Sequence, residues 1–227
     1  MNKFNGVIFD FNGVLFWDTE LQETSWKEFA FQYYNKKMTD EDLALHMHGR
    51  NGKYTFEYIL GRSITKDELA ILTEQKENIY RQMCVDLGGD FRLSPGAIEL
   101  FEALHKKKIP FTIATASAIG NLEFFIKHLK LNNWFEKDNI VYDDGTIHGK
   151  PAPDIYLKAA EKISRQPSDC IVVEDSISGL QAAHLAGIGF VIGLGPLSEH
   201  NKLSASKGVD QVIKSLKEFP TEILLSL

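Results

Sequence analysis

The sequence predicts an α/β protein: a Rossmann-like parallel sheet core that carries an inserted helical bundle. Short apolar runs alternate with amphipathic helical segments, which is typical of βαβ units with helices on both faces of a parallel sheet. Residues 18–88 are helical by pattern and contain no convincing strand. The length of 227 residues exceeds one domain of about 150 residues and leaves room for such an insert.

The strands and helices of the core follow from local composition. Each expected strand is a short run of apolar residues, rich in Val, Ile and Phe, with turn-forming or polar residues at its ends. Each expected helix repeats apolar residues at spacings of three and four. The expected strands are 7–9, 111–114, 139–142, 170–173 and 190–192, with an edge strand at 211–213. The expected helices are 98–109, 121–131, 154–164 and 178–187.

The insert has its own helix signals. In the segment SITKDELAIL, Thr65 can cap a helix start, because Glu68 follows three residues later and completes a capping box. Gly88-Gly89 is the expected hinge at which the chain returns to the core. The predicted domains are therefore a core formed by 1–17 and 89–227 and a helical cap formed by 18–88.

Composition excludes several classes of protein. The chain has 25 basic and 31 acidic residues, a net charge of −6, which disfavours nucleic-acid binding because phosphates require a basic face. No apolar run approaches 18 residues, so no membrane span is expected. The two cysteines, Cys84 and Cys170, form neither a disulfide scaffold nor a zinc signature. The N-terminus has no basic-then-apolar leader, so we expect a cytoplasmic enzyme, as a monomer or weak dimer.

Polar residues follow three of the expected strands at the point where each strand ends. Asp10 follows the first strand, residues 115–117 (Thr-Ala-Ser) follow the second, and residues 174–176 (Glu-Asp-Ser) follow a later one. Lys150 lies in a tight Gly-Lys-Pro turn. Because ligands bind outside the carboxyl ends of parallel strands, these groups predict one functional site at that edge.

Four segments of the sequence resemble the haloacid dehalogenase superfamily: VIFDFNGVL, TIATAS, GKPAPDIY and VVEDSISGLQAAHLAGI. They occur in the order and approximate spacing of that family, and the resemblance covers nearly the whole chain. It is to the subgroup with a helical cap after the first strand, which includes phosphatases and β-phosphoglucomutase. The resemblance implies a Mg²⁺-dependent phosphohydrolase that acts on a small phosphorylated metabolite.

The resemblance also implies a role for each site residue. Asp10 would attack phosphorus and form an aspartyl-phosphate. Asp10, Asp175 and the backbone carbonyl of Asn12 would hold Mg²⁺, with Glu174 binding the ion or supporting its ligands. Lys150 would balance these carboxylates and hold the phosphoryl oxygens. The hydroxyl and backbone groups that would contact the same oxygens belong to Phe11, Thr115, Ala116 and Ser117.

Asn12 departs from the family pattern, which usually has Asp two residues after the nucleophile as general acid and base. A carboxamide cannot shuttle a proton near neutral pH, and such catalysis is worth about 10²–10⁴-fold. Three explanations stay open. In the first, Asn12 is native, and either the leaving group needs little protonation or a cap residue supplies the proton. In the second, Asn12 is an introduced change that stops turnover and traps a ligand. In the third, the protein is catalytically silent and binds phosphate and Mg²⁺.

Two other reactions are possible within the same superfamily. A dehalogenase would dispense with Mg²⁺, but the pair Glu174 and Asp175 would then repel each other and an anionic substrate. A β-phosphoglucomutase-like phosphoryl transferase is less well supported. This chain has Glu23 where that mutase has a cap-hinge histidine, and Ala118-Ile119 where it has a lysine-asparagine pair. Hydrolysis is therefore the expected reaction.

Substrate choice is expected to come from the cap. Arg50 and Lys53 lie in the segment HMHGRNGK, which reads as a glycine-bounded loop that could bind the distal group of an anionic substrate. The same segment could equally be an exposed turn between helices with solvated charges. Trp17 and Trp26 are expected to pack in the core of the cap.

Overall fold

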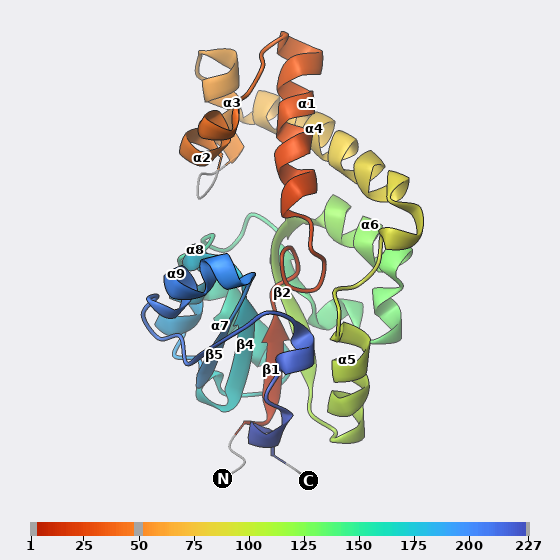
Figure 1. The fold of residues 1–227 in the computed structure, drawn as a ribbon, viewed down its shortest axis with the longest axis vertical. Coiled ribbons are helices and arrows are strands. Elements are labelled where there is room, and N and C mark those ends of the chain that lie inside the picture. Colours follow the sequence, from red (N-terminus) through yellow and green to blue (C-terminus); the bar gives the residue numbers. More distant parts are fainter. Residues whose placement is uncertain (1–3, 48–51, 226–227) are drawn as a thin grey trace. The chain divides into compact units, whose positions relative to one another are not determined.

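The computed structural model describes residues 4–47 and 52–225. The chain divides into two compact units (Figure 1). The sheet unit comprises Met1–Trp17 and Arg92–Leu227, and the helical unit comprises Asp18–Phe91. The second boundary therefore lies three residues beyond the sequence-based boundary at 88/89.

A six-stranded parallel sheet forms the centre of the sheet unit, with the strand order β3-β2-β1-β4-β5-β6. β1 lies between β2 and β4, so that Val7 pairs with Phe111 on one side and with Ile171 on the other. The strands are β1 (Gly6–Phe9), β2 (Phe111–Ala118), β3 (Val141–Asp143), β4 (Cys170–Glu174), β5 (Phe190–Leu194) and β6 (Gln211–Ile213). The predicted Rossmann-like α/β core is confirmed.

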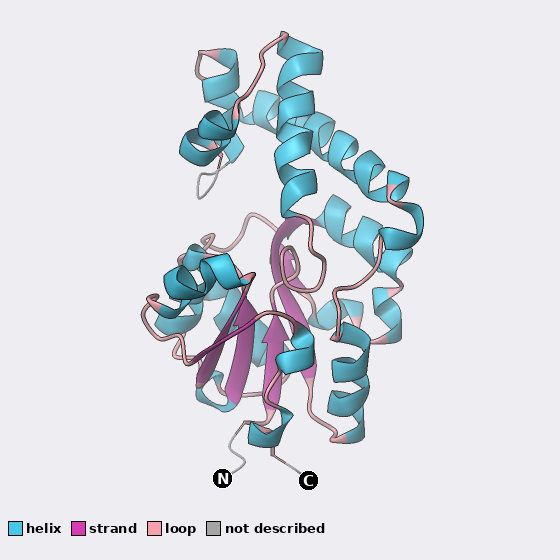
Figure 2. Ribbon diagram, viewed as in Figure 1, coloured by secondary structure: helices cyan, strands magenta, loops and turns pink. Residues whose placement is uncertain are grey.

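Helices cover both faces of this sheet (Figure 2). In the described part of the sheet unit, the α-helices are α5 (Ala97–Lys106), α6 (Ile119–Leu129), α7 (Asp154–Lys162), α8 (Ile177–Leu185) and α9 (His200–Ser204). Ile8 points to the face covered by α7 and α8, where it shares a core cluster with Tyr156 and Leu180. The next residue, Phe9, points to the opposite face and meets the ring of Phe101 of α5 at 5.7 Å. This alternation is the two-residue period of a strand that is buried on both sides.

The structure differs from the sequence-based elements in two places that matter for the site. β2 runs to Ala118 rather than ending at residue 114, because Ala118 also pairs with Asp143 of β3 after a shift in register. β3 begins at Val141 rather than at residue 139, because Lys137–Asn139 forms a 3₁₀ turn. Both differences arise from pairing between strands that are distant in sequence.

The helical unit contains α1 (Thr19–Tyr34), α2 (Asp40–His46), α3 (Gly52–Leu60) and α4 (Lys66–Asp86), followed by a 3₁₀ turn at Gly88–Asp90. Its core is aromatic: the ring of Phe56 lies 4.7 Å from Trp26 and 5.2 Å from Phe29. The expectation for Trp17 is wrong, because this side chain is 48% exposed and the residue belongs to the sheet unit.

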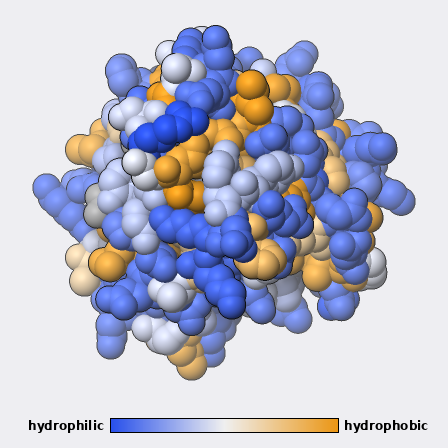
Figure 3. Space-filling model, turned by 90° about the horizontal axis from the view of Figure 1, so that it is seen from above, coloured by the Kyte–Doolittle hydropathy of each residue, from blue (hydrophilic) through white to orange (hydrophobic). Residues whose placement is uncertain are grey.

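The face shown in Figure 3 is largely hydrophilic, with smaller apolar patches between the polar residues. Among the helices in the described parts of the chain, none combines the length and the apolar composition needed to cross a membrane.

The predicted capping box at the start of α4 is present. Thr65 Oγ1 accepts a hydrogen bond from the backbone N–H of Glu68, and the Glu68 carboxylate accepts one from the backbone N–H of Thr65. Thr65→Ala is therefore expected to lower the free energy of unfolding by about 1 kcal/mol, measured by urea denaturation. The control is Thr73→Ala in the interior of the same helix, where Ala is the better helix former. An equal loss in both variants would contradict the capping role.

Candidate functional site

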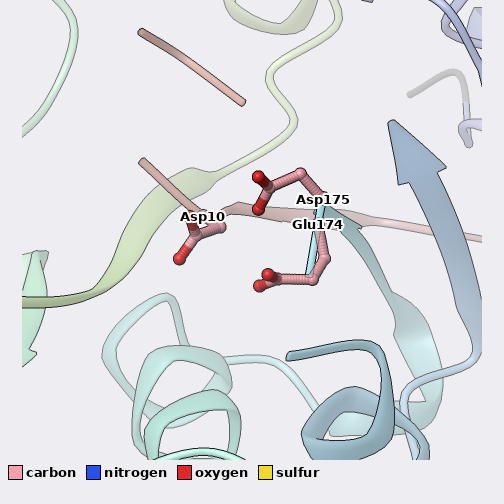
Figure 4. Close-up of side chains that lie close together, drawn as sticks. All are labelled: Asp10, Glu174 and Asp175. Atoms are coloured by element: carbon pink, nitrogen blue, oxygen red, sulfur yellow. The ribbon is translucent and has the colours of Figure 1, made fainter. Parts of the chain in front are cut away.

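Three carboxylates meet at the carboxyl ends of β1 and β4 (Figure 4). Asp10 directly follows β1, Glu174 ends β4, and Asp175 is the next residue. β1 and β4 are adjacent and parallel, with Phe9 paired to Val173, so their ends bring these side chains together. One oxygen from each carboxylate lies within 4.8 Å of the other two. Asp10 and Glu174 are buried, and Asp175 is partly exposed.

Lys150 links two of these carboxylates. Its Nζ donates hydrogen bonds to Asp10 Oδ1 at 2.5 Å and to Glu174 Oε2 at 2.7 Å. Burial alone would lower the pKa of this lysine, but the charges of Asp10 and Glu174 raise the pKa well above its ordinary value. The ammonium group therefore stays charged at neutral pH and compensates one of the three negative charges.

Glu174 is held from several directions. Besides Lys150, it accepts hydrogen bonds from the Tyr156 hydroxyl and from the backbone N–H and the Oγ of Ser176, the latter two at 3.1 and 2.6 Å. Burial raises the pKa of this carboxyl, but the Lys150 ammonium and these hydrogen bonds outweigh burial and hold the pKa below its ordinary value. Glu174 is therefore an ionised carboxylate with a fixed orientation.

The role of Tyr156 at this site was not among the sequence-based predictions. Tyr156 occupies a buried position on α7, where apolar periodicity predicts only core packing. Its hydroxyl nevertheless contacts a charged group, and a tyrosine hydroxyl that is fully buried usually has a hydrogen-bond partner. A buried Tyr six residues after the predicted lysine is the only hint that the sequence contains.

A second group of side chains joins β1 to its other neighbour, β2. Ser117 Oγ donates a hydrogen bond to Asn12 Oδ1 at 2.9 Å. The Ser117 backbone N–H in turn donates to Thr115 Oγ1 at 3.1 Å. The extension of β2 beyond residue 114 brings Ser117 to Asn12. Thr115 is buried, whereas Ala116 is exposed.

The chain after Asn12 forms a tight loop. The backbone of Asn12 bridges to Phe16, and the Gly13 N–H donates to the Phe16 carbonyl at 2.7 Å. The Phe11 side chain is fully buried against the ring of Phe125, at 4.4 Å. Only the backbone of Phe11 is therefore a candidate for contact with a ligand.

Two glycines make room for the carboxylates. A Cβ at Gly13 would lie 1.9 Å from Asp175 Oδ2, and the φ of +78° at Gly13 also disfavours any other residue. A Cβ at Gly179 would lie 2.0 Å from the carboxylate carbon of Glu174. The acidic cluster therefore depends on the absence of side chains at both positions.

Gly179→Ala is expected to displace Glu174 and to lower the free energy of unfolding by about 1–3 kcal/mol, the usual cost of overpacking a buried position. Urea denaturation measures this loss. Gly89→Ala is the control, because a Cβ there meets no atom within 4 Å and the backbone is not left-handed. Equal stability of the two variants would contradict the close packing of Glu174 on Gly179.

The two residues expected to select the substrate belong to the helical unit. Arg50 is outside the described residues. Lys53 does not lie in a loop, because α3 already begins at Gly52; its half-exposed side chain forms an ion pair with Glu57 at 3.8 Å. Lys53 belongs to the helical unit, whereas the acidic cluster belongs to the sheet unit.

The donor set of the cluster fits a hard divalent cation. Three carboxylates share one lysine, which leaves an excess of negative charge in a largely buried place. The cluster consists of oxygen donors, which suit Mg²⁺ and do not suit softer metals that prefer sulfur or imidazole. Glu174 already accepts hydrogen bonds from three other residues, Lys150, Tyr156 and Ser176.

Comparisons with known proteins agree with this geometry. The model of the haloacid dehalogenase-like hydrolase family matches residues 4–187. A Drosophila melanogaster protein named "probable pseudouridine-5′-phosphatase" is 33% identical over 226 residues, which cover 98% of this chain and 94% of that protein. The (DL)-glycerol-3-phosphatase 2 of Arabidopsis thaliana is 33% identical over 95% of this chain and 89% of its own.

A solved structure is similar over almost its full length. The crystal structure of a family IA, variant 3 hydrolase of the same superfamily from Entamoeba histolytica aligns with a TM-score of 0.91 and 42% identity, and covers 96% of each chain. The family match covers most of the chain, and the fold and the sequence agree with it. The chain belongs to the haloacid dehalogenase-like hydrolase family.

Proposed function

We propose that this protein is a Mg²⁺-dependent phosphohydrolase of small phosphorylated metabolites that works through an aspartyl-phosphate on Asp10. The observation that carries this proposal is the position of the Asp10 carboxylate, bonded to the Lys150 ammonium and close to two further carboxylates. The relatives support the reaction class: besides the two phosphatases above, the fructose-1-phosphate phosphatase YqaB of Escherichia coli is 29% identical over 83% of this chain.

Each site residue of the sheet unit would have its own role in the reaction. Asp10 would attack phosphorus, and the bond from phosphorus to the ester oxygen would break. Lys150 donates a hydrogen bond to the Asp10 carboxylate and would offer positive charge to the phosphoryl oxygens, while Glu174 holds the lysine in place. The Thr115 hydroxyl and the backbone of residues 115–117 would hold the transferred group. Water would then cleave the aspartyl-phosphate and release inorganic phosphate.

The metal ion would act on the charge of the substrate. When bound, Mg²⁺ supplies positive charge that neutralises the phosphoryl oxygens as charge develops on them. Asp10, Asp175 and the backbone carbonyl of Asn12 would hold the ion, with Glu174 in support. The helical unit is proposed to act as the cap, and Arg50 and Lys53 remain candidate contacts for the distal part of the substrate.

Asn12 supports a second candidate function, a protein that binds phosphate and Mg²⁺ without turnover. Both candidate functions need the same charges at the acidic cluster of Asp10, Glu174 and Asp175. They differ only in whether the site breaks the ester bond once it is occupied. Turnover therefore separates them, and binding alone does not.

The test is phosphate release from a panel of phosphate esters, with Mg²⁺ and after chelation. We expect release with Mg²⁺, loss of release with EDTA, and recovery when Mg²⁺ is added back in excess. Release that is insensitive to EDTA would contradict the metal dependence. Binding of inorganic phosphate with Mg²⁺ but no release from any ester would favour the silent protein.

A further inference from the structure

We propose that the substrates are aryl or enol phosphates, in which a weakly basic oxygen joins the phosphoryl group to a flat, apolar group. This inference rests on the proposed function and names its substrate class. Two features of the sheet unit support it: the chemistry of Asn12 beside the nucleophile, and exposed apolar residues that follow the strands carrying the acidic cluster.

Asn12 lies two residues after Asp10, at the position where a general acid would protonate the leaving oxygen of the ester. Its carboxamide has no ionisable proton, and its oxygen accepts the hydrogen bond of Ser117 Oγ at 2.9 Å. Ser117 is fixed in turn by its backbone bond to Thr115. Ser117 therefore acts as a positioning residue that fixes the orientation of the amide.

The charged groups of the cluster are committed to one another. The Lys150 ammonium donates to Asp10 and to Glu174, and Glu174 also accepts from Tyr156 and Ser176. Lys150, Asp10 and Glu174 are therefore arranged to hold charge rather than to pass a proton to an ester oxygen. The leaving group is expected to depart as an anion.

Departure as an anion selects among esters by the basicity of the leaving oxygen. A phenol has a pKa of about 10, as in the tyrosine side chain. Simple alcohols, like water, are much weaker acids than a phenol, so an alkoxide is a far more basic leaving group than a phenolate. Protonation by a general acid is worth about 10²–10⁴-fold, and an alkyl ester needs that help far more than an aryl ester does.

Three exposed apolar side chains, which we call the apolar rim, follow the strands that carry the cluster. Trp17, Ile119 and Ile177 are 48%, 40% and 38% exposed. They follow β1, β2 and β4, which are neighbours in the sheet, so all three lie at its carboxyl edge. Sites for organic ligands are usually lined by apolar side chains around a few polar groups.

Each member of the apolar rim is close in the chain to a residue of the site. Trp17 directly follows Phe16, whose backbone bridges to Asn12. Ile119 lies two residues after Ser117, and Ile177 lies two residues after Asp175. We therefore expect a flat apolar group attached to a phosphate at Asp10 to contact these apolar side chains.

The reaction balances without a proton donor on the enzyme. An oxygen of Asp10 forms a bond to phosphorus, the phosphorus–oxygen bond to the leaving group breaks, and that oxygen keeps the electron pair as a phenolate or enolate. Water then attacks phosphorus and regenerates the Asp10 carboxylate. One proton of that water stays on inorganic phosphate, and the other ends on the released anion.

The first test is kcat/KM for a series of substituted phenyl phosphates and alkyl phosphates with Mg²⁺. We expect a steep fall as the pKa of the leaving group rises. Asn12→Asp should increase kcat/KM for alkyl phosphates by about 10²–10⁴-fold and change 4-nitrophenyl phosphate by a few-fold at most. Ser117→Ala should not reproduce this change in the dependence on the leaving group.

The second test concerns the apolar rim and does not depend on Asn12. Ile119→Ser should raise KM for phenyl phosphate by about 10-fold, the lower end of what one apolar contact contributes in a pocket, and leave inhibition by inorganic phosphate unchanged. The control is Leu197→Ser, an exposed apolar residue that follows β5 outside the rim. Equal effects of the two variants would overturn the role of the rim.

The outcomes separate this inference from the proposed function. Turnover that requires Asp10 and Mg²⁺ but is equally fast for alkyl and aryl phosphates would overturn the substrate class alone. An equal gain for all esters in Asn12→Asp would do the same. Turnover that survives the loss of Asp10 would instead overturn the proposed function.

Discussion

Replacement of Asp10 by Asn is expected to abolish phosphate release, with kcat lower by about 10⁴-fold or more, as is typical when a catalytic nucleophile or its partner is removed. A carboxamide is a poor nucleophile and cannot form the acyl phosphate. The substitution also removes one of the two carboxylates with which Lys150 forms an ion pair. The measurement is phosphate release with Mg²⁺ for the wild type and the variant.

A covalent readout makes this prediction specific to the nucleophile. Acid quenching of the wild type during turnover should trap a phosphoryl group on the peptide that contains Asp10, detected by mass spectrometry, and Asp10→Asn should trap none. The matched control is Asp138→Asn, an exposed position of the same unit that should retain full activity. A phosphoryl group trapped on another residue would contradict the assignment of Asp10.

The sheet was predictable because its strands are local signals. The runs at 7–9, 170–173 and 211–213 are apolar, and they became β1, β4 and β6 with at most one added residue at either end. The extension of β2 was not predictable, since residues 115–118 (Thr-Ala-Ser-Ala) are small and form a strand only by pairing with β3. That extension brings Ser117 to Asn12.

The composition of the site was predictable, but its contacts were not. The order of parallel strands predicts that Asp10, Glu174 and Asp175 lie at one edge, and the three carboxylates do lie together. The hydrogen bond from the Tyr156 hydroxyl on α7 to Glu174 at the end of β4 joins two different elements. The apolar periodicity of a helix cannot predict such a contact. Lys53 illustrates the opposite error, because two glycines suggested a loop where α3 begins.

Lys150→Met is expected to lower the free energy of unfolding of the metal-free protein by about 3–5 kcal/mol, the usual cost of leaving a buried charge without its partner. The Lys150 side chain is 9% exposed, and the variant leaves Asp10 and Glu174 close together without the ammonium group. Urea denaturation in EDTA measures this loss. Lys158→Met is the control: its ion pair with Asp144 is longer, at 3.5 Å, and half-exposed, so its loss should cost at most about 1 kcal/mol.

The loss in Lys150→Met should depend on pH with a defined sign. In the wild type, Lys150 holds the pKa of Glu174 below its ordinary value of 4.5, so this pairing stabilises the fold above that pH. Its contribution is lost as the pH falls through the folded-state pKa. In the variant, burial without a cation raises the carboxyl pKa, so acid relieves the repulsion instead. The difference in stability between the two proteins should therefore be largest at neutral pH and should shrink as the pH falls, first through the raised carboxyl pKa of the variant and then through the lowered pKa of Glu174 in the wild type. A difference that stays constant with pH would show that Lys150 stabilises the fold by packing rather than by charge.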